Sequence, residues 1–146
     1  MPALQALVTD IWDIGSDWEL EELYGAVGDE RWDRWLLPRV MGRLWAELDH
    51  VWVTEANGEV VGFVSYGVSQ ARRVGVIHYN GVARGFRGRG IGTRQIEHVL
   101  GLMRQAGMEL AAVGTGLNER HAAARRQYER AGFTPVIEYR MYARRL

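Results

Sequence analysis

Residues 86–100 read FRGRGIGTRQIEHVL, in which a stretch rich in glycine and arginine passes directly into a regular apolar repeat. The preceding residues, VGVIHYNGVA at 74–83, alternate between apolar and polar as a strand does, and the apolar residues after Gly90 recur at helical spacing. The stretch therefore joins a strand to a helix through a tight turn. This junction excludes an all-helical or all-β chain and requires a mixed fold.

A strand–turn–helix junction leaves main-chain N–H groups unpaired at the start of the helix, where the helix dipole also favours negative charge. Gly88, Gly90 and Gly92 let an anion approach the main chain without meeting a Cβ atom. Arg87 and Arg89 supply charge-assisted donors. The sequence therefore predicts a local anion site, of which a phosphate site is the usual kind.

Two common phosphate-binding motifs do not fit this turn. A P-loop requires Lys and then Ser or Thr after its last glycine, but here Gly90 is followed by Ile91 and Gly92. A dinucleotide fingerprint requires a third glycine, where this chain has Thr93, and a βαβ unit, whereas the preceding strand follows an antiparallel hairpin. Both nucleotide triphosphate hydrolysis and dinucleotide binding are disfavoured.

The rest of the chain shows a regular order of elements. Residues 1–14 fit either a strand or a frayed helix. The remaining pattern predicts a helix opened by Ser16 in a capping box with Glu19, a helix at 30–48, strands at 51–56 and 59–69 joined by the Asn57-Gly58 turn, a strand at 74–83, a helix at 90–107, a strand at 108–116, a helix at 119–132 and a final strand at 134–146. Within the helix at 30–48, apolar residues at helical spacing indicate a buried face: Trp32, Leu36, Val40, Leu44 and Leu48, widened by Trp35, Met41 and Trp45. Pro38 either kinks this helix or marks its start.

Composition limits the classes of function. A chain of 146 residues with 47% hydrophobic residues fits one compact domain, residues 1–146. The net charge is zero, so no basic field favours nucleic acid or an anionic membrane. The absence of cysteine excludes disulfides, zinc–thiolate sites and a thiol nucleophile, and no metal site is predicted. Without a leader or a long apolar run, we expect a soluble cytoplasmic protein.

The pattern Arg87-x-x-Gly90-x-Gly92 resembles the Q/R-x-x-G-x-G/A signature of the GNAT superfamily of N-acetyltransferases, and YERAGF at 128–133 resembles its second landmark. The resemblance extends over residues 51–146 and is closest to an uncharacterised subgroup. It implies an α/β domain of the α+β type, with a mixed, mostly antiparallel sheet and helices on both faces. It further implies transfer of an acetyl group from acetyl-CoA to a primary amine by direct attack.

The resemblance also assigns roles to residues. The cofactor's pyrophosphate would lie on the amides of Arg87, Gly88, Arg89, Gly90, Ile91, Gly92 and Thr93. The pantetheine arm would pair with the main chain of Val82 and Ala83, where the third and fourth strands splay. Tyr128 matches the aromatic position whose hydroxyl protonates the leaving thiolate, or else it only packs the helix on the sheet. His121 stands seven residues earlier, where many members have Asn, and either bonds the cofactor arm or caps the helix.

The sequence identifies the general base less clearly than it identifies the cofactor-binding residues. Strand alternation predicts that Val76, His78, Asn80 and Val82 share one face. The superfamily often has a carboxylate at the position of Val76, and this chain does not. His78, which titrates near neutral pH, would relay the proton through water while Asn80 orients the amine. A structural histidine held by a main-chain carbonyl, with water alone as the base, is the competing interpretation.

Other interpretations remain open at this stage. A catalytically idle acyl-CoA sensor would need the turn but not Tyr128 or His78, and an RNA-binding domain is disfavoured by the neutral charge. We expect Arg125 and Arg126 to be solvated. The acceptor amine is not predicted beyond a small molecule or a peptide, and a homodimer through the exposed final strand is an expectation.

Overall fold

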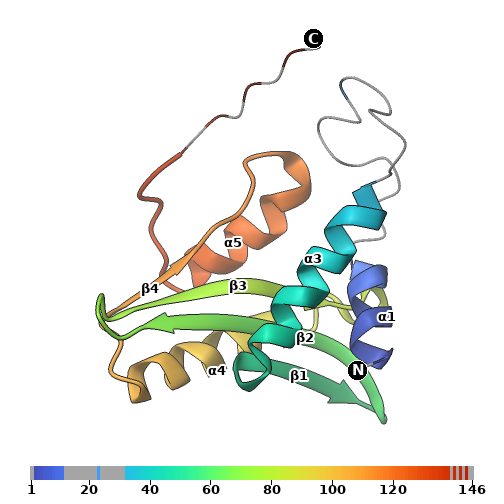
Figure 1. Ribbon diagram of the computed structural model, residues 1–146, viewed down its shortest axis with the longest axis horizontal. Coiled ribbons are helices and arrows are strands. Elements are labelled where there is room, and N and C mark those ends of the chain that lie inside the picture. Colours follow the sequence, from blue (N-terminus) through green and yellow to red (C-terminus); the bar gives the residue numbers. More distant parts are fainter. Residues whose placement is uncertain are drawn as a thin grey trace.

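The computed structural model describes residues 2–11, 23, 32–138, 140, 142 and 144. The helices and strands are α1 (Pro2–Ile11), α3 (Trp32–Ala46), β1 (Val51–Ala56), β2 (Glu59–Ser69), β3 (Val74–Val82), α4 (Ile91–Gln105), β4 (Leu110–Val113) and α5 (Ala122–Arg130). Short 3₁₀ turns lie at Leu48–His50, Arg84–Phe86 and Glu119–His121. The strands form one four-stranded sheet in the order β1-β2-β3-β4 (Figure 1).

The sheet is mixed, as predicted. β1 and β2 form the expected hairpin, in which Asn57 and Gly58 both have positive φ angles, 53° and 80°. Two successive left-handed residues make the turn whose twist matches that of antiparallel strands. β2 and β3 are also antiparallel, whereas β3 and β4 run parallel, because α4 carries the chain back between them.

Helices cover both faces of the sheet, and β2 shows how. Phe63 packs against α1 and α3, whereas its neighbour Val64 packs against α4, because successive strand residues face opposite sides. In Figure 1, α3 crosses in front of the strands and α4 passes behind them. α5 adds Tyr128 to the cluster on the α4 side. The predicted fold class is therefore confirmed.

The region before the sheet differs in part from the prediction. The open question at residues 1–14 is settled for Pro2–Ile11, which form a helix, with Leu4, Leu7 and Val8 buried. The helix predicted at 30–48 spans Trp32–Ala46 and contains Pro38 in its interior. The helix predicted from Ser16 lies outside the described residues, apart from Leu23, which is helical and exposed.

The predicted stripe on α3 is narrower than expected. Val40, Met41 and Leu44 are buried, but Trp45 is 51% exposed and Leu48 lies beyond the helix and is also exposed. Val40, Met41 and Leu44 belong to the buried cluster that also contains residues of α1 and Phe63 of β2, and Trp45 lies outside this cluster. The side chains of Trp32, Trp35 and Leu36 lie outside the description.

The last part of the chain departs furthest from the prediction. The strand expected at 108–116 is limited to Leu110–Val113, and it is half-buried instead of buried. The final strand is wrong for the residues that the structure describes beyond Phe133, which have no strand assignment and are exposed. A strand-like sequence forms a strand only where a neighbouring strand accepts its hydrogen bonds, and in this part of the structure the sheet ends at β4.

Candidate active site

β3 and β4 separate at one end, as predicted. Their pairing runs from Val74 opposite Leu110 to Ile77 opposite Val113 and stops there, although β3 continues to Val82. From His78 onward, the edge of β3 that faces β4 is therefore not paired with it. This leaves a gap between the two strands that begins at His78.

A β-bulge marks the same position. Ser65 of β2 is opposite Tyr79 and the next residue, Tyr66, is opposite Ile77, so His78 is an extra residue in β3. The bulge reverses the alternation beyond it. α1 and α3 cover the same face of the sheet. His78 faces α3 and Gly81, three residues later, faces α1, so Asn80, the neighbour of Gly81, lies on the α4 side. The prediction that Val76, His78, Asn80 and Val82 share one face is therefore wrong: His78 and Asn80 lie on opposite faces.

The main chain of β3 beyond the bulge is directed in a regular way. The Ala83 N–H donates to Val61 O at 2.8 Å, and Val82 lies opposite Gly62. In an antiparallel ladder this means that Asn80 and Val82 turn their N–H and C=O groups away from β2 and toward the gap. The amide of Ala83, which was predicted to pair with the cofactor, is instead bonded to β2. The Val82 carbonyl accepts a hydrogen bond from Arg87 Nε at 3.0 Å.

The glycine-rich turn has the geometry of an anion cradle. Gly88 and Gly90 have φ angles of 76° and 74°, a conformation that favours glycine, and Gly90 is the N-cap of α4. The first helical bond runs from Arg94 N to Gly90 O. The amides of Ile91, Gly92 and Thr93 have no acceptor inside the helix, and the N-cap has no side-chain hydrogen bond. The predicted start of the helix is confirmed.

The arginines of the turn brace its main chain. Arg89 Nη2 donates to Gly85 O at 3.1 Å and its guanidinium lies 5.0 Å from the centre of the Phe86 ring. Arg94 Nη1 donates to Arg89 O at 3.3 Å. These bonds use only part of each guanidinium, which has five N–H donors. The turn is thereby held in one shape while keeping positive charge at the helix start.

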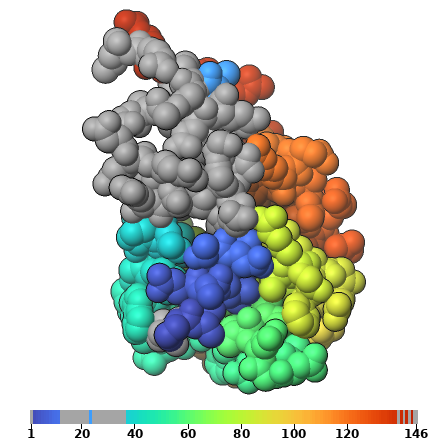
Figure 2. Space-filling view, turned by 90° about the vertical axis from the view of Figure 1, so that its right-hand side faces the viewer, coloured from blue at the N-terminus to red at the C-terminus, as the bar shows by residue number. Residues whose placement is uncertain are grey.

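The turn is also tied to α1. The amide of Arg84 donates to Asp10 Oδ2 and its Nε donates to Asp10 O, both at 3.2 Å. Figure 2 shows α1, in blue, in contact with the yellow segment that contains the turn. Through Asp10, α1 therefore helps to hold the chain that leads into the predicted cofactor site.

Two orphaned polar atoms border the gap. Within the described part of the chain, Asn80 Oδ1 and Gln127 Nε2 are buried and have no hydrogen-bond partner. Gln127 lies so close to Gly92 that a Cβ atom there would stand 2.8 Å from its Nε2. Buried acceptors and donors are normally satisfied, so these atoms fit a ligand that carries both amide and phosphate groups. The residues present therefore fit the pantetheine and pyrophosphate of acetyl-CoA.

Tyr128 lies on α5, next to the same end of the gap. Its ring is 6.0 Å from that of Phe133 in an edge-on arrangement, and Phe133 N donates to Tyr128 O at 3.0 Å. The ring packs beside the buried cluster that contains Ile77, the last paired residue of β3. Burial raises the pKa of the Tyr128 hydroxyl above its ordinary value of 10.0, so the hydroxyl keeps its proton at neutral pH.

His78 lies on the other face, among charged residues of α3. Its Nε2 is 3.1 Å from Arg43 Nη2 and 3.6 Å from Glu47 Oε2. Burial first, and then the positive charge of Arg43, lower the pKa of His78 below 6.5, against the opposing effect of Glu47. The ring is therefore neutral at pH 7, and Arg43 can donate to it only if the proton of the imidazole is on Nδ1.

Residues 12–133 match a family model described as Acetyltransferase (GNAT) family. The chain belongs to the GNAT acetyltransferase family. It is 32% identical over 109 residues to "Uncharacterized N-acetyltransferase MJ1207" of Methanocaldococcus jannaschii, a match covering 71% of this chain and 46% of that protein. It is 31% identical over 86 residues to "5-NmdU N-acetyltransferase" of Pseudomonas phage PaMx11, covering 59% of this chain and 58% of that protein.

The chain thus spans about half the length of the curated relatives it matches. Among solved structures, PH1933 from Pyrococcus horikoshii OT3 superposes with a TM-score of 0.68 at 23% identity, covering 92% of this chain and 83% of that one. At this identity the likeness shows the fold alone, and it agrees with the GNAT-like architecture described above.

One interpretation of the sequence predicted that the side chain of His121 caps α5, and in this GNAT chain it does not. It occupies the N-cap position without a side-chain cap bond, and its Nδ1 lies 2.5 Å from Asn118 Oδ1. Asn118 instead caps the short 3₁₀ turn by accepting from the His121 amide. Arg125 is not solvated as expected, because its Nη1 donates to the carbonyls of Gly116 and Asn118 at 2.7 Å each. The role of His121 toward a cofactor stays a prediction.

Sequence reasoning missed three polar residues of this GNAT site. Arg43 and Glu47 form an i,i+4 ion pair on α3, a pattern visible in the sequence but indistinguishable there from a solvated helix face. Gln127 precedes Tyr128, and nothing in the sequence says that it meets Gly92. Contacts between elements distant in sequence bring all three residues to the site.

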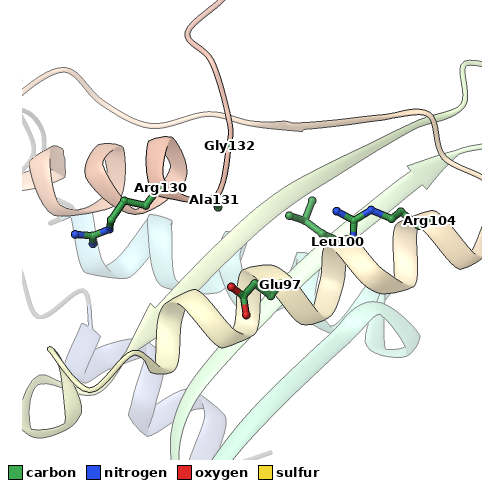
Figure 3. Close-up of a pocket in the computed structure, with 6 residues that line it drawn as sticks. All are labelled: Glu97, Leu100, Arg104, Arg130, Ala131 and Gly132. Carbon is green, nitrogen blue, oxygen red and sulfur yellow. The ribbon is translucent and has the colours of Figure 1, made fainter.

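A pocket lies apart from the gap in the GNAT fold, between α4 and the end of α5. Figure 3 shows Leu100 and Arg104 rising from α4 toward the chain at Gly132, whereas Arg130 points away. The pocket contains none of the predicted site residues. Among the helices in the described residues, none is both long and apolar enough to cross a bilayer.

Proposed function

We propose that this chain transfers an acetyl group from acetyl-CoA to an amine, with the acceptor entering on the α3 side of the sheet. The observation that carries the proposal is the gap between β3 and β4 beyond Ile77, together with the start of α4 at Gly90, where no side chain caps the helix. The unpaired part of β3, from His78 to Val82, leads through the short turn Arg84–Phe86 to Gly90, and an extended thioester with a diphosphate at one end would follow this order of elements. Family membership supports the same chemistry.

The residues would divide the task by position. The amides of the turn residues, Arg87, Gly88, Arg89, Gly90, Ile91, Gly92 and Thr93, would hold the pyrophosphate. The outward main-chain groups of Asn80 and Val82, not that of Ala83, would pair with the pantetheine arm. Gln127 Nε2 and Asn80 Oδ1 would complete these contacts, because both atoms are buried without a partner. His121 stays a weaker candidate, since its ring is engaged by Asn118.

The chemistry needs one base and one acid. The amine nitrogen attacks the thioester carbon, a C–N bond forms and the C–S bond breaks. The amine proton passes through water to His78 Nε2 on the α3 side. The hydrogen bond from Arg43 to this nitrogen opens as the proton arrives, and Glu47 Oε2, 3.6 Å away, stabilises the cation that forms. Tyr128, which keeps its proton at neutral pH, gives that proton to the departing sulfur. His78 and Tyr128 approach the gap from opposite faces, so His78 would take the proton of the attacking nitrogen while Tyr128 protonates the departing sulfur.

Two measurements test the proposal. Calorimetry should detect acetyl-CoA binding that ADP, which has the diphosphate but no pantetheine arm, reproduces only weakly. Release of free thiol should then follow with at least one amine in a panel that includes 5-NmdU, the compound in the name of the phage relative. Tight binding with no thiol release for any amine would instead support an idle acyl-CoA-binding module. Failure to bind acetyl-CoA at all would overturn both interpretations.

A further inference from the structure

An amide side chain lies within the apolar face that α4 turns toward the sheet. Ile91, Ile96, Val99 and Met103 are buried on this helix, and Gln95 is buried with them at 5% exposure. Burial of an amide costs free energy unless its polar atoms form hydrogen bonds, whereas an apolar side chain would fill the position without that cost. Packing of the fold alone therefore does not account for Gln95.

One end of this amide is bonded and the other is not. Gln95 Nε2 donates to Thr54 Oγ1 of β1 at 2.9 Å. Gln95 Oε1 is buried and has no hydrogen-bond partner among the described residues. Buried acceptors are normally satisfied, so this arrangement makes the fold less stable than an apolar side chain would. An amide that lowers stability here indicates a role other than stability.

The amide lies on a row of paired residues that crosses three strands. Gln95 Nε2 is so close to β2 that a Cβ atom at Gly62 would stand 2.5 Å from it. Gly62 pairs with Thr54 of β1 on one side and with Val82 of β3 on the other. Gln95 therefore contacts the first two residues of a row whose third residue, Val82, would pair with the pantetheine arm.

The same side chain belongs to the part of α4 that would hold the pyrophosphate. Gln95 lies about one helical turn after Ile91, whose amide, like those of Gly92 and Thr93, has no acceptor inside the helix. Apolar contacts have no preferred direction, whereas a hydrogen bond requires a narrow range of distances and angles. Gln95 thus links the start of α4 to the row that ends at Val82 by a contact of defined geometry.

We propose that Gln95 is a positioning residue, which fixes the start of α4 relative to β3 so that one extended ligand reaches the pyrophosphate amides and the pantetheine-pairing groups at the same time. The inference rests on the proposed binding of acetyl-CoA. A ligand that joins two binding parts gains affinity only when the spacing of the two sites matches its own length. Loss of the Gln95 hydrogen bond should therefore weaken binding of the whole cofactor more than binding of either part.

Calorimetry with the cofactor and with its two parts gives the first test. In Gln95→Leu, the dissociation constant for acetyl-CoA should rise about tenfold, while those for ADP and S-acetylpantetheine should stay within about twofold. The melting temperature should not fall, because the variant removes a buried acceptor that has no partner in the described part of the chain. Thr54→Val removes the other member of the hydrogen bond and should weaken acetyl-CoA binding in the same way.

Ser65→Ala is the matched control. Ser65 is the other buried polar residue of the described chain, and its Oγ also lacks a partner there. It lies two residues after Phe63, on the face covered by α1 and α3, so its variant should bind acetyl-CoA with parental affinity. A lower melting temperature with unchanged acetyl-CoA affinity in Gln95→Leu would show that the amide serves only the fold. An equal loss of affinity for ADP and acetyl-CoA would show that it acts on the turn alone. Either result would overturn the proposal.

Hydrogen exchange without any cofactor gives a second test, which does not depend on the proposed function. The amide of Arg94, which forms the first bond of α4 with Gly90 O, should exchange about tenfold faster in Gln95→Leu than in the parent chain. The amide of Met103, near the other end of α4, should keep its parental rate. An unchanged rate at Arg94 would overturn the positioning role even if acetyl-CoA binds. Faster exchange in a chain that does not bind acetyl-CoA would support the fixed start of α4 and overturn only the proposed function.

Discussion

Arg43 Nη2 lies 3.1 Å from His78 Nε2 across the interface of α3 and the bulge in β3. Arginine is always a donor, so this contact holds the imidazole neutral, with Nε2 as the acceptor. Glu47 Oε2 stands 3.6 Å from the same nitrogen and acts in the opposite sense. In addition to burial, an ion pair on a different element therefore adjusts the pKa of His78.

Changing either member of that ion pair should move the pKa of His78 in opposite directions. Burial lowers this pKa most, Arg43 lowers it further, Glu47 raises it and His50 lowers it slightly. Arg43→Met should therefore raise the pKa, and Glu47→Gln should lower it further. Titration of the imidazole resonances by NMR measures both shifts. If kcat/KM falls at low pH through His78, its acidic limb should move with the same signs; equal pKa values in the two variants would refute the coupling.

The same lowered pKa has a consequence for folding. Since the folded-state pKa lies below the ordinary 6.5, the unfolded chain binds this proton more tightly. The contribution of His78 to the free energy of unfolding is therefore complete above pH 6.5 and is lost as the pH falls through the folded-state value. Urea unfolding at several pH values should show this loss in the parent chain, and a smaller one in His78→Gln. An identical pH dependence in the two proteins would contradict it.

Tyr128→Phe should lower kcat by about 10²–10³-fold, because the variant keeps the ring that packs against Phe133 but loses the proton donor. The dissociation constant for acetyl-CoA should stay within about twofold. Thiol release across pH and calorimetry separate the two effects. Tyr142→Phe, at a tyrosine that is exposed to solvent, is the control and should change neither quantity. An unchanged kcat in Tyr128→Phe would remove its role as the acid.

Gly92→Ala should raise the dissociation constant for acetyl-CoA about tenfold, because the new Cβ would stand 2.8 Å from Gln127 Nε2 and force that amide away. The double variant Gly92→Ala with Gln127→Ala relieves the clash but also removes the donor. If Gln127 contacts the cofactor, the double variant should therefore bind no better than Gln127→Ala alone. Full recovery of parental affinity in the double variant would mean that Gln127 only fills space.

Two glycine substitutions should change stability in opposite directions. A Cβ at Gly101, within α4, meets nothing within 4 Å, so Gly101→Ala should stabilise the fold by about 0.5–1 kcal/mol through helix propensity. A Cβ at Gly75, in β3, would stand 2.5 Å from Met103 Sδ, so Gly75→Ala should destabilise by about 1–3 kcal/mol through overpacking. Chemical denaturation measures both changes. A destabilised Gly101→Ala would show that α4 is bent or crowded there.

The local features of the sequence predicted the local features of the structure well. Asn57-Gly58 does form the hairpin turn and Gly90 does start α4, because both depend on backbone conformations that neighbouring residues determine by themselves. Trp45 and Leu48 were predicted to lie on the buried face of their helix, and both are exposed, because burial depends on contacts with other elements. Helical spacing says which residues share a face, but only the position of α1 and the sheet says how far along α3 that face is covered.

The bulge at His78 is the clearest limit of the sequence. One extra residue in β3 reverses the alternation, and nothing in VGVIHYNGVA distinguishes the bulged strand from a regular one. It placed Asn80 on the face opposite to His78. The final strand was also wrong, since a strand-forming sequence becomes a strand only when it pairs with a sheet edge, and the described residues after Phe133 have no strand pairing.

By itself, the sequence determined the order of helices and strands from Trp32 to Arg130, the turn that starts α4 and the family, since all of these depend on short-range spacing and backbone preference. Only the tertiary structure decided which side chains face each other across the sheet. A single inserted residue, or one unpaired edge, changes those contacts without changing any local pattern, because side-chain direction in a strand depends on its register with a neighbour.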